Sequence, residues 1–331
     1  MRASIRILGA AAAVALAIAG TSAQSPSIPR TPWGDPDIQG TYTNSSESGI
    51  PMERPAELAG RRLEDVKPEE LAKLIQQRAA RAEETAEVIG GTQDENTGAG
   101  PKHWYENYQA TNSRAWMISD APDYKMPATT DDAKRRAAAA RAARRGGDGY
   151  YTGPFDGPED LTLYVRCITR GVPGSMMPAI YGNSYEIVQS PGVVAIRYEM
   201  VHETRVIPLD GRKTLPAHMQ SYMGDSRGHW EGDTLVVEGS RYLEKSAFGG
   251  ASSALKTIER FRPTSKDTLE WSITFDDATT WVKPWTFGMR LTRDDEHPIF
   301  EYACHEGNEG LRGILSAARV AEKEQAGRPP R

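Results

Sequence analysis

The feature that most constrains the fold is a series of short strand-like segments between residues 185 and 304. Each segment is rich in β-branched and aromatic residues or alternates apolar with polar ones. Turn-forming pairs separate several of them, namely Pro191-Gly192, Asp210-Gly211, Gly232-Asp233 and Asp276-Asp277. Connections this short join antiparallel neighbours, because parallel strands need longer crossovers. The expected strands cover residues 185–189, 193–199, 204–209, 234–242, 255–262, 268–275, 280–291 and 299–304.

Eight consecutive strands of this kind either leave two exposed edges or close into a barrel, and closure removes the edges. We therefore expect a mainly β fold, an up-and-down antiparallel meander that closes into a lipocalin-like barrel with peripheral helices. Residues 37–43 alternate in the same way and are expected to add a first strand. A barrel of this size holds either one small ligand or a packed core.

Three segments show helical patterns. Pro68 is suited to a first helical position, and apolar residues then recur at three and four until Gly90-Gly91. Thr129 or Thr130 is expected to cap a second, basic and alanine-rich helix that reaches Arg145. A third helix is expected after Gly310. The apolar stripe of the first helix is narrow, which indicates a surface position.

The first 23 residues are typical of a secretory signal peptide. Arg2 and Arg6 precede or flank an apolar run over residues 9–20, and Thr21-Ser22-Ala23 offers small residues for cleavage. The protein is therefore expected in the periplasm or outside the cell, cleaved near Ala23. No later stretch is long and apolar enough to predict membrane insertion. The expected organisation is a signal peptide (1–23), a lead-in with surface helices and the first strand (24–160), the barrel (161–310) and a C-terminal helix and tail (311–331).

Charge gives no general reason to bind nucleic acid. The 331-residue chain has 40 Lys and Arg residues against 45 Asp and Glu residues. The basic stretch near residues 134–145 is isolated and has no aromatic residues for base stacking, so we interpret it as a solvated helix. The expected partner is a small-molecule ligand, and the pattern does not indicate an oligomeric state.

The chain has two cysteines, and Cys167 with Cys304 is the only bridge that it can form. An exported protein favours a disulfide, although two buried thiols would fit as well. Cys304 as a nucleophile beside His305 is less favoured, because neighbours on a strand point to opposite faces. Two cysteines alone cannot form a structural zinc site, and the six histidines lack the usual metal-ligand spacings. We predict no metal and no cofactor.

Several long motifs resemble those of a large family of exported bacterial proteins of unknown function. They are TPWGDPDIQG (31–40), RCITRGVPG (166–174), IPLDGR (207–212), GDSRGHWEGDTLVVE (224–238) and EYACHEGN (301–308). The resemblance covers nearly the whole chain after the signal peptide. It implies an exported protein and brings no established reaction or catalytic residues.

One motif has the spacing of a serine hydrolase. Gly224 to Gly228 fits G-x-S-x-G with Ser226 at its centre. That motif functions on a turn between an apolar strand and a helix, whereas here a strand-like segment follows it. A structural role for Ser226 in a turn is the preferred interpretation, with nucleophilic catalysis as an alternative.

Four residues are candidates for acid/base catalysis. His202 lies near Glu199 at an expected strand turn, and His305 and Glu306 follow the last expected strand. Strand ends surround a barrel mouth, and an imidazole beside a carboxylate is suited to proton transfer near neutral pH. Each histidine taken alone could equally be an ordinary loop residue.

Other side chains are candidates for substrate binding. Arg205 or Arg227 could hold an oxygen of the substrate, and Tyr185, Trp230 and Trp285 could contact its ring. Any one of these aromatic residues could instead belong to the core.

Two classes of function compete. One is a small-molecule enzyme that uses metal-free acid/base chemistry, such as elimination, isomerisation or hydrolysis, on a ring-bearing compound. The other is a non-catalytic, lipocalin-like binding protein for an apolar or aromatic ligand. Charged groups that converge inside the barrel would favour the enzyme, since a carrier needs a mainly apolar wall.

Overall fold

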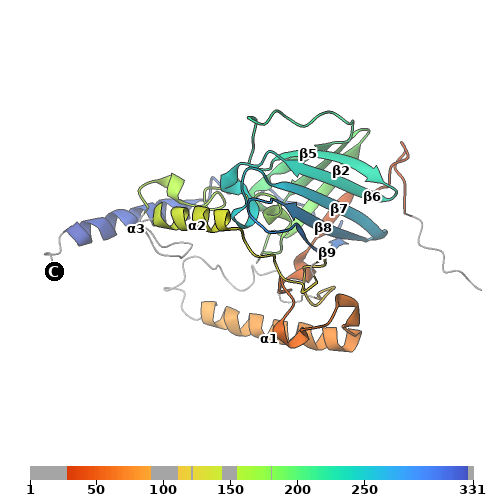
Figure 1. Ribbon diagram of the computed structural model, residues 1–331, viewed down its shortest axis with the longest axis horizontal. Helices are drawn as coiled ribbons and strands as arrows, with labels where there is room; N and C mark the ends of the chain where they lie inside the picture. Colours follow the sequence, from red (N-terminus) through yellow and green to blue (C-terminus); the bar gives the residue numbers. More distant parts are fainter. Residues whose placement is uncertain (1–27, 91–110, 121, 144–154, 180, 327–331) are drawn as a thin grey trace, which may run out of the picture.

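The computed structural model describes residues 28–90, 111–120, 122–143, 155–179 and 181–326. Nine antiparallel strands form one sheet in the order β4-β3-β2-β1-β9-β8-β7-β6-β5, and the sheet curls into a nearly closed barrel (Figure 1). The expected mainly β meander is confirmed. The strands are β1 (Gly40–Thr43), β2 (Ser184–Ser190), β3 (Val193–Tyr198), β4 (Thr204–Pro208), β5 (Asp225–Glu231), β6 (Thr234–Ser240), β7 (Lys256–Ser265), β8 (Thr268–Asp276) and β9 (Trp285–Arg293).

The barrel closes through its first and last strands. β1 pairs with β9 through Tyr42 and Thr43, and with β2 along its whole length. The gap in the ring therefore lies between β4 and β5, which are consecutive in the chain. Side chains close this seam: a Cβ atom on Gly228 would lie 2.5 Å from Leu209 Cδ2 and 2.8 Å from Ile207 Cγ2. The absence of a side chain at Gly228 thus lets the two edges approach each other.

Two expectations about individual strands were wrong. Ser226, expected in a turn, lies in β5, which pairs with β6 across the Gly232-Asp233 hairpin. Residues 299–304, expected as the last strand, are irregular. The edge of β9 that such a strand would occupy is already taken by β1 and by residues 117–119, since Ser119 N donates to Thr286 O and Gly288 N to Met117 O.

The two ends of the barrel differ. The β2–β3, β5–β6 and β7–β8 connections are tight hairpins at one end, which we call the hairpin end. The β3–β4, β6–β7 and β8–β9 connections meet at the other end, together with residues 164–183. We call this the loop end. Loops carried by a rigid scaffold are the usual place for binding and catalytic groups.

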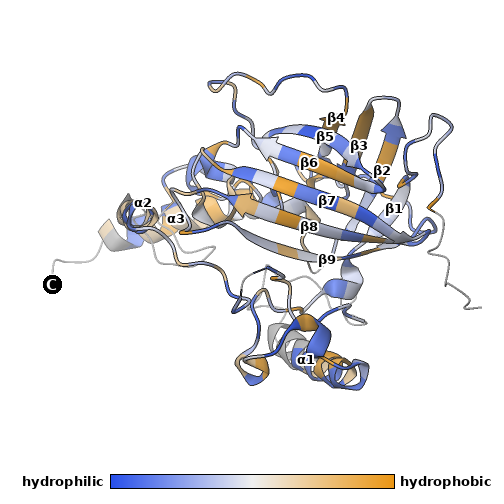
Figure 2. Ribbon diagram, turned by 45° about the vertical axis from the view of Figure 1, so that its right-hand side comes forward, coloured by the Kyte–Doolittle hydropathy of each residue, from blue (hydrophilic) through white to orange (hydrophobic). Residues whose placement is uncertain are grey.

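The barrel interior is a core rich in aromatic side chains. Figure 2 shows the alternation of hydrophobic and hydrophilic residues along the strands, as expected when one face is buried. Phe275 stacks on Trp285 with ring centroids 4.9 Å apart, and Phe287 stacks on Phe275 at 5.8 Å. Tyr185 and Trp285 are 1% and 0% exposed. These two expected ligand contacts are therefore part of the packed interior.

The three expected helices are present as α1 (Pro68–Gly90), α2 (Asp131–Ala143) and α3 (Glu309–Ala326). α2 begins after Thr130, whose hydroxyl accepts a hydrogen bond from Ala133 N at 3.1 Å. α1 lies apart from the barrel and packs on a small cluster around Trp116, whereas α2 and α3 lie at the loop end (Figure 1). None of the helices within the described part of the chain is long and apolar enough to cross a membrane. The expected signal peptide lies outside the described residues.

Candidate functional site

A disulfide between Cys167 and Cys304 holds the loop end together, as predicted. It joins residues 164–169 to the segment that returns from β9 toward α3. Tyr164 also contacts the β3–β4 connection, with its hydroxyl 3.6 Å from Met200 Sδ. Asn308 ties the same region to α3: its Oδ1 accepts from Leu311 N, and its Nδ2 donates to Val165 O at 2.8 Å. The segments that carry His202 and His305 are thereby connected to one short stretch of chain.

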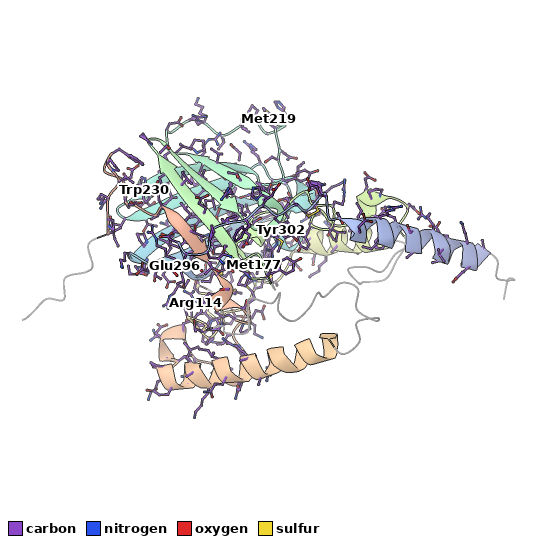
Figure 3. The ribbon with its side chains drawn as sticks, turned by 180° about the vertical axis from the view of Figure 1, so that it is seen from behind. Arg114, Met177, Met219, Trp230, Glu296 and Tyr302 are labelled. Carbon is purple, nitrogen blue, oxygen red and sulfur yellow. A yellow bond between two sulfur atoms is a disulfide. The ribbon has the colours of Figure 1, made fainter. Side chains whose placement is uncertain are left out.

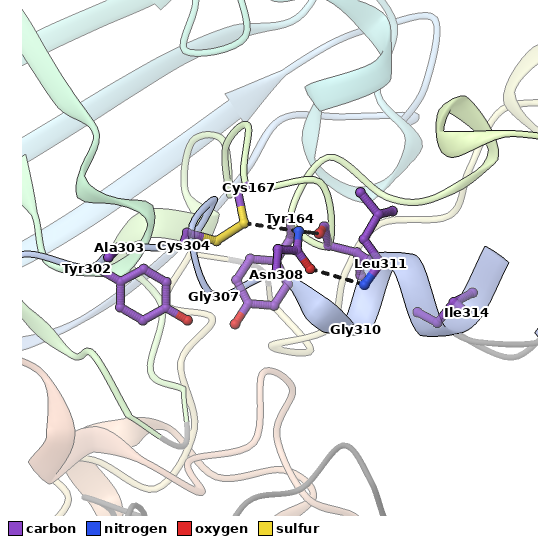
Figure 4. A pocket seen from close by; sticks show the side chains of 11 residues that line it. Tyr164, Cys167, Tyr302, Ala303, Cys304, Gly307, Asn308, Gly310, Leu311 and Ile314 are labelled. Atoms are coloured by element: carbon purple, nitrogen blue, oxygen red, sulfur yellow. Dashed lines mark hydrogen bonds between the residues drawn. A yellow bond between two sulfur atoms is a disulfide. The ribbon is translucent and has the colours of Figure 1, made fainter. Parts of the chain in front are cut away.

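A pocket of about 290 Å³ lies beside the disulfide (Figure 4). Its wall comes from residues 164–167, from residues 302–308 and from the first turns of α3. Tyr164 and Tyr302 contribute phenol groups to the wall. Burial raises the pKa of Tyr302 above its ordinary value, and the neighbouring phenols of Tyr181 and Tyr164 raise it further. Among the described residues, no Asp, Glu, Lys, Arg or His lines this outer pocket. The lining is Tyr164, Val165, Cys167, Tyr302, Ala303, Cys304, Gly307, Asn308, Gly310, Leu311 and Ile314.

A group of hydrogen-bonded polar side chains lies inside the barrel. Arg205 of β4 is 3% exposed, and its Nη2 lies 2.5 Å from Oε1 of Glu259 on β7. Arg205 Nε donates to Ser226 Oγ at 2.8 Å. Glu259 Oε2 in turn accepts from Trp271 Nε1 at 3.2 Å. Tyr198, at the end of β3, interacts with Arg205 through its hydroxyl. We call Arg205, Glu259, Ser226 and Tyr198 the interior polar cluster.

The interior polar cluster contains buried groups whose hydrogen-bond geometry is poor. Arg205 Nη1 and the Tyr198 hydroxyl are buried without a hydrogen bond of normal geometry, although they interact electrostatically. The hydroxyl of Tyr185, opposite Tyr198 on β2, is in the same situation. Buried polar groups are nearly always paired, so unpaired ones need a specific reason. Arg205 and Tyr198 lie on the adjacent strands β4 and β3 and interact with each other, so both groups face the same part of the interior.

The charge of Arg205 is fixed by its partner. Burial lowers the pKa of the Arg205 guanidinium, but the Glu259 carboxylate, together with Tyr198 and Tyr242, raises the pKa by more in total, so the arginine stays charged. The Arg205–Glu259 pair is neutral as a unit. Burial raises the pKa of Tyr198 far above its ordinary value, so this phenol keeps its proton.

Glu203 stands at the rim of the cluster. It precedes β4 in extended conformation, and residues two apart on a strand share a face, so its side chain is on the side of Arg205. Thr169 donates from Oγ1 to Glu203 Oε2 at 2.6 Å. Burial raises the pKa of the Glu203 carboxyl, which the hydrogen bond from Thr169 offsets only in part. A carboxyl group with a raised pKa beside a buried ion pair is a candidate acid or base.

The raised pKa of Glu203 predicts a pH-dependent stability. Because the folded protein holds this proton more tightly than the unfolded chain, Glu203 destabilises the fold increasingly as pH rises above its ordinary pKa. Glu203→Gln removes the effect and keeps an acceptor for Thr169. We expect the variant to gain free energy of unfolding relative to the wild type as pH rises from 4 to 8 in urea titrations. A difference that does not change with pH would contradict the raised pKa.

The catalytic residues that the sequence predicted lie on the outside of the loop end. His202, in the turn η8 (Met200–His202), His305 and Glu306 are exposed. Glu199 accepts a hydrogen bond from Ser184 N, and its nearest imidazole is that of His297 at 4.0 Å. The structure thus brings the expected residues to one end of the barrel and leaves their imidazoles in solvent.

Three further residues have different surroundings from those expected. Arg227 points outward from β5 and is held by Asp225 at 2.5 Å and by the carbonyl of Lys213. Trp230 lies beside the Gly232 hairpin, at the opposite end from Tyr302 (Figure 3). Ser226 is 5% exposed on β5, at the edge of the sheet that faces β4, and accepts a hydrogen bond from Arg205. It therefore stands on a strand and not on a turn between a strand and a helix.

Sequence reasoning did not select Glu203, Glu259 or Tyr198 as site residues. The signal for Glu203 was available, because it shares a strand face with Arg205. Glu259 lies within an expected strand. The signal for it was an acidic residue at a position that the alternation along the strand assigns to the barrel interior. No group of three or more His, Cys, Asp or Glu side chains suited to a metal ion occurs in the described ranges.

No family model, curated protein or solved structure matches this chain. The function of the site is therefore argued from its own residues.

Proposed function

We propose that this protein is an exported enzyme that performs metal-free acid/base chemistry on a small organic molecule at the loop end of the barrel. The observation that carries the proposal is the interior polar cluster. Charged and hydrogen-bonding groups converge where a carrier of apolar ligands would present an apolar wall. The N-terminal pattern and the disulfide support export.

Arg205 and Tyr198 would hold an oxygen of the substrate. Because Glu259 already neutralises Arg205, a neutral carbonyl or hydroxyl oxygen fits better than a carboxylate. Both donors are fixed by the barrel before the substrate arrives. Donors of this kind stabilise the negative charge that develops on the oxygen when a proton is removed nearby.

Glu203 would transfer the proton. It lies on the strand face of Arg205, and a carboxyl whose pKa is shifted toward neutrality is more effective in both directions of proton transfer. His202, adjacent and exposed, would exchange that proton with water. His305 and Glu306, joined to the site through the disulfide, are the second acid/base candidates at this end.

The test uses deuterium. The purified mature protein is incubated in ²H₂O and EDTA with a library of aromatic and sugar-derived carbonyl and hydroxy compounds. Mass spectrometry then detects elimination, isomerisation with deuterium uptake, or hydrolysis. We expect Glu203→Gln to lower the rate on any converted compound by about 10²- to 10⁴-fold. The matched control is Glu186→Gln, which changes a carboxylate on the outer face of β2.

Two results would contradict this mechanism. Conversion that persists in Glu203→Gln and in His202→Asn would exclude the assigned proton transfer. Covalent labelling of Ser226 by a fluorophosphonate would support the serine hydrolase alternative instead.

A binding protein is the second candidate, and the outer pocket favours it. Because the described residues that line the outer pocket include no charged side chain, the pocket suits an uncharged, ring-bearing ligand that stacks on Tyr164 or Tyr302. A compound that raises the thermal unfolding temperature of the wild type and of Glu203→Gln equally, without being converted, would support this candidate.

A further inference from the structure

A basic groove of about 350 Å³ lies on the outer surface of the barrel. It is formed by β6, β7 and β8 together with the loop that carries Arg114, and the site inside the barrel does not include it. Arg260 and Arg262 reach it because they alternate with the inward-facing Glu259 and Phe261 along β7. Its lining residues are Arg114, Thr234, Arg260, Arg262, Glu270, Trp271 and Ser272.

Positive charge dominates this basic groove. Its lining holds three arginines and one glutamate, a net charge of +2. Glu270 is shared, with Oε2 2.8 Å from Arg114 Nη2 and Oε1 3.6 Å from Arg290 Nε. Arg260 contacts Glu231 at 2.6 Å. Arg262, by contrast, is exposed and makes no side-chain hydrogen bond or ion pair within the part of the chain that the structure describes.

Ser272 contributes a small hydroxyl side chain to the lining of the basic groove. Ser272 lies opposite Arg260 on one side and Gly288 on the other. A Cβ atom on Gly288 would come within 3.0 Å of Ser272 Cβ, so a larger residue would not fit there. Within the described residues, the hydroxyls of Thr234 and Ser272 make no hydrogen bond either, which leaves both able to donate to a ligand.

We propose that the basic groove binds the phosphate group of a small phosphate monoester or of inorganic phosphate. A planar guanidinium can donate two parallel hydrogen bonds to such a group, and the hydroxyls of Ser272 and Thr234 add further donors. The net charge of the lining matches the charge of nearly −2 that a phosphate monoester carries at neutral pH. The indole ring of Trp271 faces the core, so the groove recognises the anionic group and offers no aromatic surface for stacking.

The proposal is tested by isothermal titration calorimetry at low ionic strength with inorganic phosphate and, separately, glucose 6-phosphate. We expect Arg262→Gln to weaken binding about tenfold or more, because it removes a charged donor. Arg262→Lys should recover part of the affinity, since it keeps the charge and loses the fork of donors. The matched control is Arg135→Gln, which removes another exposed arginine, on α2 and away from the basic groove.

Each outcome bears on the proposal. Binding of either probe that is lost in Arg262→Gln and kept in Arg135→Gln supports it, and the stronger probe shows whether the ester or the free ion is preferred. Equal weakening in both variants would indicate general electrostatic attraction and overturn the site. A wild-type protein that binds neither probe would also overturn the proposed site. Thermal unfolding without ligand should be unchanged in Arg262→Gln, because this exposed side chain supports no core contact.

Discussion

Glu259→Gln is expected to lower the free energy of unfolding by about 3–5 kcal/mol. The substitution leaves the Arg205 guanidinium charged and buried without a counter-ion, since Glu259 is 0% exposed and is its only ion-pair partner among the described residues. The glutamine amide has one oxygen and one NH₂ group, so it can accept the hydrogen bond from Trp271 Nε1 only when its oxygen faces the indole. Urea unfolding of both proteins at pH 7 measures the difference. A loss below about 1 kcal/mol would mean that water reaches the pair.

The double variant Arg205→Met with Glu259→Leu separates stability from function. A buried ion pair replaced by apolar groups of similar size is often neutral or stabilising, because the cost of removing two charges from water disappears. We therefore expect the double variant to be at least as stable as the wild type and to lose the proposed activity. Full activity in a stable double variant would show that the interior polar cluster has no catalytic role.

Removal of the disulfide by Cys167→Ala with Cys304→Ala is expected to cost roughly 5 kcal/mol. The two cysteines are 137 residues apart in the sequence, and the entropy lost by the unfolded chain rises with the length of the closed loop. Chemical unfolding under non-reducing conditions gives the difference.

The reduced wild type is the control for the disulfide variant. It should show the same loss, since it lacks the bridge and keeps both side chains. Two thiols that react with an alkylating reagent in the untreated mature protein would contradict the bridge itself.

The sequence predicted the sheet well because its pattern is local. Alternation along β2, β3, β7 and β8, and glycine- or aspartate-containing turns between strands, depend on near neighbours in the chain. The helix bounds at Pro68 and Thr130 follow from capping rules of the same local kind. The segments whose strand predictions were wrong depend on partners that are distant in the sequence. β5 contains Ser226 and Gly228, which have low strand propensity, and its position is decided by contact with β4 and β6.

The site was harder to predict for a related reason. His202, Glu199 and Arg205 were selected by residue type and position at strand ends, and the structure places their segments at one end of the barrel. Whether an inward-facing polar residue is paired depends on strands far apart in the sequence. Arg205 and Glu259 are 54 residues apart, and Thr169 reaches Glu203 from a segment without regular secondary structure. Local sequence patterns carry no information about such pairs.

The seam between β4 and β5 also determines how the chain can be divided. Because β1 pairs with β9, the ring of backbone ladders is continuous everywhere except at this seam. No backbone hydrogen bond joins β4 to β5 in the described ranges, and the segment between them, residues 209–224, belongs to no strand of the sheet. A chain interrupted within this segment would keep every strand pairing of the barrel. In topological terms the barrel can be opened there without loss of a strand pairing, so the fold is compatible with a cut or an insertion at this position.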